Sequence, residues 1–145
     1  LRFFLNQGFN QVEYVGYGPT ESYLDKHHAT AFSPYKTTPE SNHVPYLKPQ
    51  ENGSHYGCRE LKVLNSSDCF IVQSHTPFSM NVSPYSQEEL SSKKHQYDLE
   101  KSGSTILCVD YKMSGVGSNS CGPALKEQYR LNETEWDWAI SLQIN

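Results

Sequence analysis

Short stretches of alternating or continuous apolar residues run through most of the chain and predict strands. Phe78, Met80 and Val82 alternate with polar residues, which is typical of a strand with one buried and one solvent-exposed face. The segment 105–111 (TILCVDY) is almost continuously apolar, as in a strand covered on both faces. Over 136–144 the alternation puts both tryptophans on one apolar face. This favours a core position for them, with a sugar-stacking platform as the alternative.

Turn signals divide the rest of the chain into further short strands. A strand pair is predicted at 59–64 and 69–73 around a polar turn, and another strand ends at the turn 16–19. The chain opens on the apolar stretch 1–5, which looks like a strand taken from a larger protein. Several short strands with turns between them predict a mainly β, antiparallel β-sandwich that forms a single domain over 1–145.

One short helix is predicted near 86–95. Ser86 and Glu89 match a capping box, in which the serine caps the helix and the glutamate reaches back. Acidic residues fall in the predicted first turn and basic residues in the last, and both favour the helix dipole. The segment 34–57 is interrupted by several prolines, so we expect an ordered loop there, and neither a helix nor a central strand.

Charge and cysteine spacing narrow the classes of function. The net charge of −4 and the scattered lysines and arginines provide no basic patch, so no nucleic-acid partner is expected. No apolar run is long enough to cross a bilayer, so no membrane partner is expected either. The cysteines match no zinc pattern and are interpreted as reduced thiols; they are Cys58, Cys69, Cys108 and Cys121.

Neither of the adjacent acidic pairs predicts catalysis. Glycoside hydrolysis needs two carboxyl groups on either side of the scissile bond. Glu88 and Glu89 belong to the predicted helix cap, and Glu133 and Glu135 to a predicted turn, so all four have structural explanations. The side chains of the His27–His28 pair are expected to diverge, which prevents joint chelation of a metal. We therefore expect no catalytic residue, no metal site and no cofactor in this chain.

Several motifs in one order resemble a known family. The run 16–26 (GYGPTESYLDK) is similar to a Gly-x-Gly-Pro-x-Glu-x-Tyr-x-Asp-Arg motif in the C-terminal domain of glycoside hydrolase family 2 β-galactosidases. Segments 45–53, 59–61 and 78–90 follow in the family's order, and the glycine-rich loop 115–122 closes the series. The resemblance implies a β-sandwich of the galactose-mutarotase-like supersandwich type, of which this chain would be the second half.

The same resemblance carries functional expectations. In this family the catalytic glutamates and the Mg²⁺ and Na⁺ ligands lie on a separate (β/α)₈ barrel, and the reaction is retaining. The resemblance thus implies a non-catalytic, C-terminal (small-chain type) fragment of an enzyme that hydrolyses terminal β-D-galactose residues, as in lactose catabolism. The expected partners are the catalytic barrel domain, a galactoside and further copies of the protein, in a bacterial-type cytoplasm.

The glycine-rich loop is where the resemblance places substrate binding. The family loop carries a tryptophan that stacks on the sugar, whereas this loop is one residue shorter and has a cysteine in that position. The residues assigned to substrate binding are Gly117, Ser118, Asn119, Ser120 and Cys121. Spacing alone favours a plain connection between strands over a ligand-facing loop.

Other interpretations remain open beside this one. Glu21, Tyr23 and Asp25 either face a ligand or hold the turn after Pro19, and the structural role is favoured. A stand-alone carbohydrate-binding module is the alternative function, and it requires aromatic side chains that face solvent. An aldose epimerase is disfavoured, because no acid-and-base spacing supports that chemistry.

Overall fold

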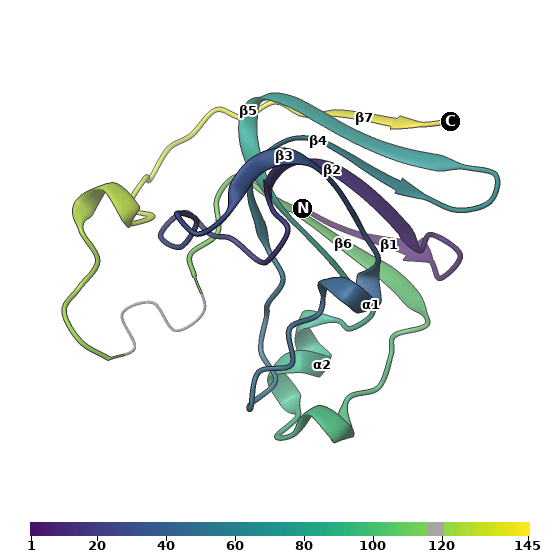
Figure 1. Ribbon diagram of the computed structural model, residues 1–145, viewed down its shortest axis with the longest axis horizontal. Helices are drawn as coiled ribbons and strands as arrows, with labels where there is room; N and C mark the ends of the chain where they lie inside the picture. Colours follow the sequence, from purple (N-terminus) through teal and green to yellow (C-terminus); the bar gives the residue numbers. More distant parts are fainter. Residues whose placement is uncertain (116–120) are drawn as a thin grey trace.

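One antiparallel seven-stranded sheet forms the body of the molecule (Figure 1). The computed structural model describes residues 1–115 and 121–145. The strands are β1 (Arg2–Asn6), β2 (Gln11–Gly18), β3 (Ala31–Thr37), β4 (His55–Leu64), β5 (Cys69–Ser83), β6 (Ser104–Asp110) and β7 (Ser141–Ile144). They lie in the order β1-β6-β5-β4-β2-β3, and β7 pairs with β5. The sheet does not close on itself, and the predicted mainly β, antiparallel, β-sandwich-type fold is confirmed.

The long strand β5 connects the two ends of the sheet. Its first part, Phe70–Gln73, pairs with β4 on one side and β7 on the other. Its last part, 79–83, pairs with β6, which in turn pairs with β1. Between these parts the pairing with β4 shifts register twice, around Cys58 and Glu60. Such irregularities bend a strand and increase its twist, so β5 can serve both ends of the sheet.

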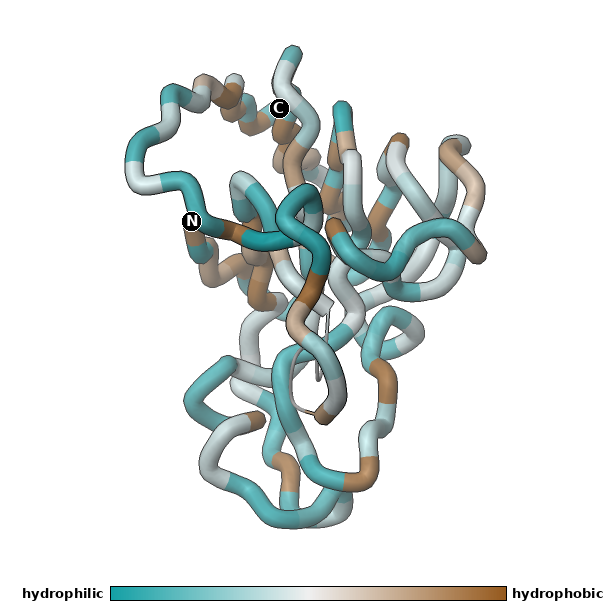
Figure 2. Tube along the Cα trace, turned by 90° about the vertical axis from the view of Figure 1, so that its left-hand side faces the viewer, coloured by the Kyte–Doolittle hydropathy of each residue, from teal (hydrophilic) through white to brown (hydrophobic). Residues whose placement is uncertain are grey.

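The hydrophobic core lies on one face of this sheet. Apolar and polar positions alternate along the strands (Figure 2), and the register aligns Tyr14 with Leu61 and Leu61 with Val72. Phe3 of β1 contacts Phe70 of β5 with ring centroids 5.1 Å apart, so β1 packs onto the same core. The burial of each aliphatic side chain in this core, such as Leu61 or Val72, contributes about 1.5–3 kcal/mol to the free energy of unfolding.

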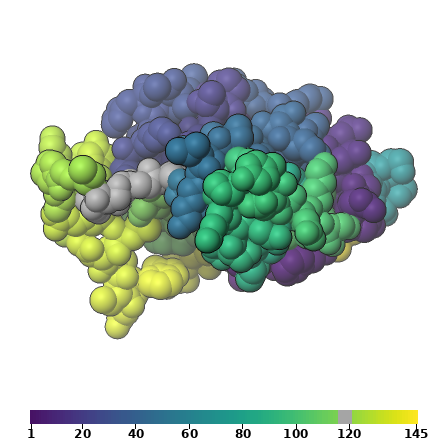
Figure 3. Space-filling view, turned by 90° about the horizontal axis from the view of Figure 1, so that it is seen from below, coloured from purple at the N-terminus to yellow at the C-terminus, as the bar shows by residue number. Residues whose placement is uncertain are grey.

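Helices and loops cover the opposite face around β5 and β6. The helices on this face are α1 (Pro39–Asn42), α2 (Gln87–Ser92) and the 3₁₀ turn Gln96–Asp98. A further 3₁₀ turn, Glu127–Tyr129, lies apart from them in the C-terminal segment (Figure 1). Figure 3 shows the segment around 43–54 (blue) beside the α2 region (green). His43 Nε2 lies 3.0 Å from Gln96 Oε1, and the Gln96 amide donates to Tyr46 O at 2.7 Å. The two segments therefore form one polar layer under the sheet.

Several predicted strands are confirmed. The pair at 59–64 and 69–73 is the β4–β5 hairpin, and β2 ends at Gly18 as predicted. Strand β6 is buried along residues 105–109, as its continuous apolar run indicated. The prediction that the polar face of β5 is exposed to solvent over 78–83 is wrong, because Ser79 and Ser83 are buried. The polar layer covers that face, and α1 contacts β5 directly.

The proline-rich segment contains more regular structure than expected. Pro34 lies within β3, an edge strand, where proline is tolerated. Pro39 begins the single turn α1, and Thr38 Oγ1 caps it by accepting the Ser41 N–H at 3.1 Å. The prediction of no helix in this segment is thus wrong, because proline fits the first helical position, where its missing N–H costs nothing.

The helix near 86–95 is present but shorter than predicted. Ser86 caps α2 by accepting the Glu89 N–H at 3.1 Å, which confirms the cap. The Glu89 carboxylate accepts the backbone N–H of Glu100 at 2.8 Å. The helix ends at Ser92, and Lys93 occupies the C-cap, so the predicted basic last turn is wrong.

The core position predicted for Trp136 is also wrong. Only β7 is a strand in the C-terminal region, and Trp136 is 61% exposed while stacking on Tyr111. Trp138 does pack against the core. Leu142 and Ile144 lie opposite Val72 and Phe70, yet remain exposed.

Candidate functional site

The run 16–26 builds a buried hub around one carboxylate. Glu21 accepts hydrogen bonds from Tyr23 Oη (2.9 Å), Lys26 Nζ (3.0 Å), the Gly53 N–H (3.0 Å) and Tyr46 Oη. Burial acts to raise the pKa of Glu21, but these hydrogen bonds favour the ionised form and hold its pKa below the ordinary value. The fully paired carboxylate joins the end of β2 to the 43–54 segment, as the structural interpretation of Glu21 predicted.

A second carboxylate in the same run holds the base of the glycine-rich loop. The Gly115 N–H donates to Asp25 Oδ1 at 2.6 Å, and the Leu24 N–H donates to Met113 O at 3.2 Å. These contacts connect residues about 90 positions apart in sequence. The turn 22–26 therefore fixes where the chain leaves β6 and enters the loop, and Asp25 combines its structural role with a position beside the loop.

Sequence reasoning missed a buried polar network behind this hub. His55, 1% exposed, lies between Tyr14 Oη (3.0 Å from Nδ1) and Asn42 Oδ1 (2.7 Å from Nε2). Nε2 faces an amide oxygen and carries the proton of the neutral ring, so Nδ1, which also lies 3.1 Å from Tyr17 O, accepts from the Tyr14 hydroxyl. The Asn42 amide donates in turn to Gly53 O at 2.7 Å and Val82 O at 3.1 Å. Burial lowers the pKa of His55 to about 4, so the ring is neutral at pH 7.

Of the residues assigned to substrate binding, one lies in the described part of the chain. Gly117, Ser118, Asn119 and Ser120 lie outside the described residues. Cys121 is exposed and has a free thiol, as do the other three cysteines. A hollow of about 370 Å³ lies beside the base of the loop, between the 48–51 segment, α2 and residues 113–115. Its lining mixes polar side chains, among them Gln50 and Gln87, with Met113 and Pro49.

Two members of the acidic pairs form ion pairs that the sequence did not predict. Glu88 forms an ion pair with Arg2 at 2.6 Å, and Glu133 forms one with Lys112. The prediction that His27 and His28 diverge is wrong, because their rings stack with centroids 4.6 Å apart and His27 Nδ1 lies 2.9 Å from Tyr23 O. Within residues 1–115 and 121–145, no three His, Cys, Asp or Glu side chains are arranged to hold a metal ion. No helix in the same ranges is long and apolar enough to span a membrane.

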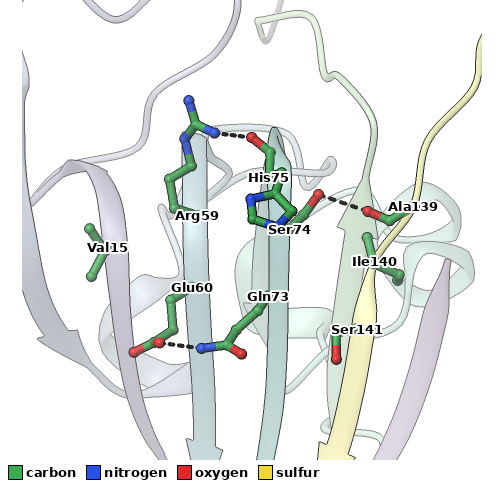
Figure 4. A pocket seen from close by; sticks show the side chains of 9 residues that line it. All are labelled: Val15, Arg59, Glu60, Gln73, Ser74, His75, Ala139, Ile140 and Ser141. Atoms are coloured by element: carbon green, nitrogen blue, oxygen red, sulfur yellow. Dashed lines mark hydrogen bonds between the residues drawn. The ribbon is translucent and has the colours of Figure 1, made fainter.

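The outer face of the sheet carries another hollow. It has a volume of about 650 Å³ and lies over β2, β4, β5 and the segment 139–141 (Figure 4). Sequence reasoning gave no indication of it, because its lining comes from four separate segments and forms no motif. The polar side chains that line it lie on the solvent side of the sheet, opposite the core.

Comparison with known proteins identifies the family. The family model described as "Beta galactosidase small chain" matches residues 1–144. A β-galactosidase of Actinobacillus pleuropneumoniae is 58% identical over 136 residues, which covers 94% of this chain and 13% of that protein. Those of Staphylococcus xylosus (39% identical) and Kluyveromyces lactis (33% identical) each match 97% of this chain and 14% of their own length.

The matched share of each relative places the chain within a larger protein. It spans about one seventh of the length of these relatives. The range 1–144 matched by the family model includes the hub around Glu21 and the loop base at Asp25. This chain belongs to the β-galactosidase small-chain family and corresponds to a fragment of a β-galactosidase.

Proposed function

We propose that this chain is a non-catalytic part of a retaining β-galactosidase and that it shapes the mouth of the substrate site. The glycosidic bond of a terminal β-D-galactose residue, as in lactose, would be cleaved by a carboxylate pair on another part of the polypeptide. The observation that carries the proposal is the loop base, where Asp25 and Leu24 hold Gly115 and Met113. A loop fixed in this way can present its tip to a ligand without losing its own position.

The acidic residues of the chain support a non-catalytic role. Glu21 accepts four hydrogen bonds from residues of this chain. Glu88 and Glu133 form ion pairs with Arg2 and Lys112. No two of these three carboxyl groups line the same cavity in the described part of the chain. Glu51 and Asp110 do share a cavity, but its volume of about 10 Å³ is too small for a sugar. The Mg²⁺ and Na⁺ sites of the family belong, in this proposal, to the part of the protein outside this chain, together with the catalytic barrel that this chain would contact.

We further propose that the protein forms homo-oligomers in a bacterial-type cytoplasm. The exposed side chains of Leu142 (45%) and Ile144 (71%) are apolar surface that an interface would remove from water. Four free thiols suit a reducing compartment. Sedimentation of the β-galactosidase that contains this chain would contradict the oligomer if only a monomer were found at high concentration.

The loop base provides the main test. In the β-galactosidase that contains this chain, Asp25→Ala removes the acceptor of the Gly115 N–H. KM for lactose should rise by about tenfold to a hundredfold, since a hydrogen bond to a charged group is worth about 1.5–3 kcal/mol. Asp68→Ala, at an exposed aspartate in the β4–β5 turn far from the loop base (Figure 1), is the matched control and should leave KM unchanged. An unchanged KM in the Asp25 variant would rule out the mouth-shaping role. Hydrolysis of a chromogenic galactoside by the 145-residue chain alone would rule out the non-catalytic role.

A carbohydrate-binding module is the second candidate, and one observation favours it. Trp136 is 61% exposed and stacks on Tyr111 at 6.2 Å with an interplanar angle of 11°, which leaves much of the indole open to solvent. An exposed indole can pack against the C–H face of a sugar ring. Titration with galactose should quench the fluorescence of the chain and should fail to do so in Trp136→Ala. Equal quenching in both proteins would exclude this platform.

A further inference from the structure

A single row of side chains crosses four strands on the outer face of the sheet. Val15 on β2 lies opposite Glu60 on β4, Glu60 lies opposite Gln73 on β5, and Gln73 lies opposite Ser141 on β7. Because cross-strand partners point to the same side of a sheet, these four side chains form the floor of the 650 Å³ hollow (Figure 4). From β2 to β7 the row therefore presents an aliphatic group, a carboxylate, an amide and a hydroxyl group in turn.

An irregularity in β5 raises the first wall of this trough. The register between β4 and β5 shifts so that Cys58 pairs with Phe78, while Glu60 pairs with Gln73. The four residues of β5 between these pairs, 74–77, lie opposite the single residue Arg59 of β4. Arg59 donates from Nη1 to the carbonyl of His75 and supports this bulge. Bulges of this kind redirect side chains and occur often beside binding sites.

The C-terminal segment provides the second wall. Ser74 Oγ donates to Ala139 O at 2.8 Å, which fastens the segment to β5 just before β7 begins. Ile140 lies at this wall and Val15 at the far side of the floor, so the trough has an aliphatic patch on each side (Figure 4). The volume falls within the ordinary range for small-molecule sites, roughly 300–1,000 Å³.

The groups in the trough retain hydrogen-bonding capacity for a ligand. The Gln73 amide donates to Glu60 Oε2 at 2.6 Å, and no described residue donates to Gln73 Oε1. Glu60 is ionised, since hydrogen bonds from Lys62 and Gln73 lower its pKa, and a carboxylate has acceptor sites beyond these two. The Arg59 guanidinium has five N–H groups, of which the His75 carbonyl engages one. The trough therefore offers a ligand hydrogen-bond donors on Arg59 and acceptors on Glu60 and Gln73.

The charges in the trough select the class of ligand. Arg59 would attract an anion and repel a cation. Glu60 would act in the opposite direction, with its charge partly offset by Lys62 at 3.0 Å. A neutral ligand whose groups both donate and accept meets no repulsion and can use Arg59, Glu60 and Gln73 together. A sugar has such groups on its hydroxyls and aliphatic C–H surface for Val15 and Ile140. We propose that this trough is an accessory site for a neutral monosaccharide or disaccharide, separate from the glycine-rich loop.

The test is a titration of the 145-residue chain with galactose and with lactose, followed by NMR. The backbone amides of 59–60 and 73–75 and the side-chain amide of Gln73 should shift, with a dissociation constant of about 1–30 mM, as expected for an open site with few hydrogen bonds. Gln73→Ala should weaken binding about fivefold, the usual worth of one hydrogen bond. Gln143→Ala is the matched control, because Gln143 lies on the same outer face in the next row and does not line the trough. It should leave binding unchanged.

Three outcomes would overturn the proposal. One is the absence of chemical-shift changes at these residues up to about 100 mM of either sugar, a concentration well above the dissociation constant expected for even a weak site. Another is equal binding by the Gln73 and Gln143 variants. The third is a response of Arg59 and His75 to sodium phosphate but not to sugar, which would make the trough an anion site. Both variants alter exposed side chains, so an unchanged melting temperature is expected and shows that each variant is folded.

Discussion

Protonation of His55 provides a quantitative test of the buried network. The neutral ring donates to Asn42 and accepts from Tyr14, and its folded-state pKa is about 4. In the unfolded chain the ring titrates near its ordinary pKa of 6.5. The unfolded state therefore binds a proton first as the pH falls. Stability is fully present above pH 6.5 and is lost progressively between pH 6.5 and pH 4.

The magnitude follows from the two pKa values. A pH of 5 lies 1.5 units below the pKa of the ring in the unfolded chain, whereas the ring in the folded chain is still mostly neutral at this pH. At about 1.36 kcal/mol per unit, the free energy of unfolding should fall by about 2 kcal/mol between pH 8 and pH 5. Glu21 contributes little in this window, because its ordinary pKa of 4.5 and its lower pKa in the folded chain both lie below pH 5.

Urea denaturation of the chain at pH 8 and pH 5 measures this loss. The comparison is with His55→Gln, whose amide can donate to Asn42 and accept from Tyr14 but does not titrate. The parent should lose about 2 kcal/mol more than the variant on acidification, because all other titrating groups are common to both proteins. An equal loss in both would refute the assignment of His55 as a buried neutral ring. An NMR titration of the ring with a midpoint near 6.5 would refute it as well.

Three further predictions concern the hub, the core and the loop. Glu21→Gln should cost about 1–3 kcal/mol at pH 7 in urea denaturation, since four donors lose a charged acceptor. The difference should vanish as the pH falls through the lowered pKa of Glu21, where the parent carboxylate is protonated, and a difference independent of pH would count against the hub. Leu61→Ala should cost about 2–5 kcal/mol, because Leu61 is fully buried at the centre of β4; a loss below about 1 kcal/mol would show that the site is not core. In the β-galactosidase that contains this chain, Cys121→Trp should change KM for lactose, and an unchanged KM would indicate that the loop does not reach the sugar.

The strands could be predicted where burial decided the pattern. Strand β6 was recognisable because it is covered on both faces and so carries an apolar run. The burial of Ser79 and Ser83 was not predictable in the same way, because their cover comes from the turn that begins at Pro39 and from the loop after it. Trp136 continues an alternating pattern but lies in an extended segment outside any strand, and alternation alone does not distinguish the two.

The site was predictable only in part. The motif 16–26 pointed to Glu21 and Asp25, but their partners Gly53 and Gly115 are brought to them by tertiary folding. The network at His55 depends on Asn42 and Tyr14, which no local pattern connects. The outer trough joins residues of four segments by strand register, and register was not available from hydrophobic alternation.

Pro34 has a consequence for how molecules of this protein meet one another. A proline in a strand is compatible with its ladder only when the missing N–H would have faced away from the neighbouring strand. Strand β3 therefore presents an incomplete row of donors at the outer edge of the sheet, and a strand from another molecule would find no partner at that position. Uncontrolled edge-to-edge growth, which leads to aggregation, is thereby discouraged on this side. The opposite edge is formed by β1, which contains the exposed Phe4 and no proline that would interrupt its row of donors.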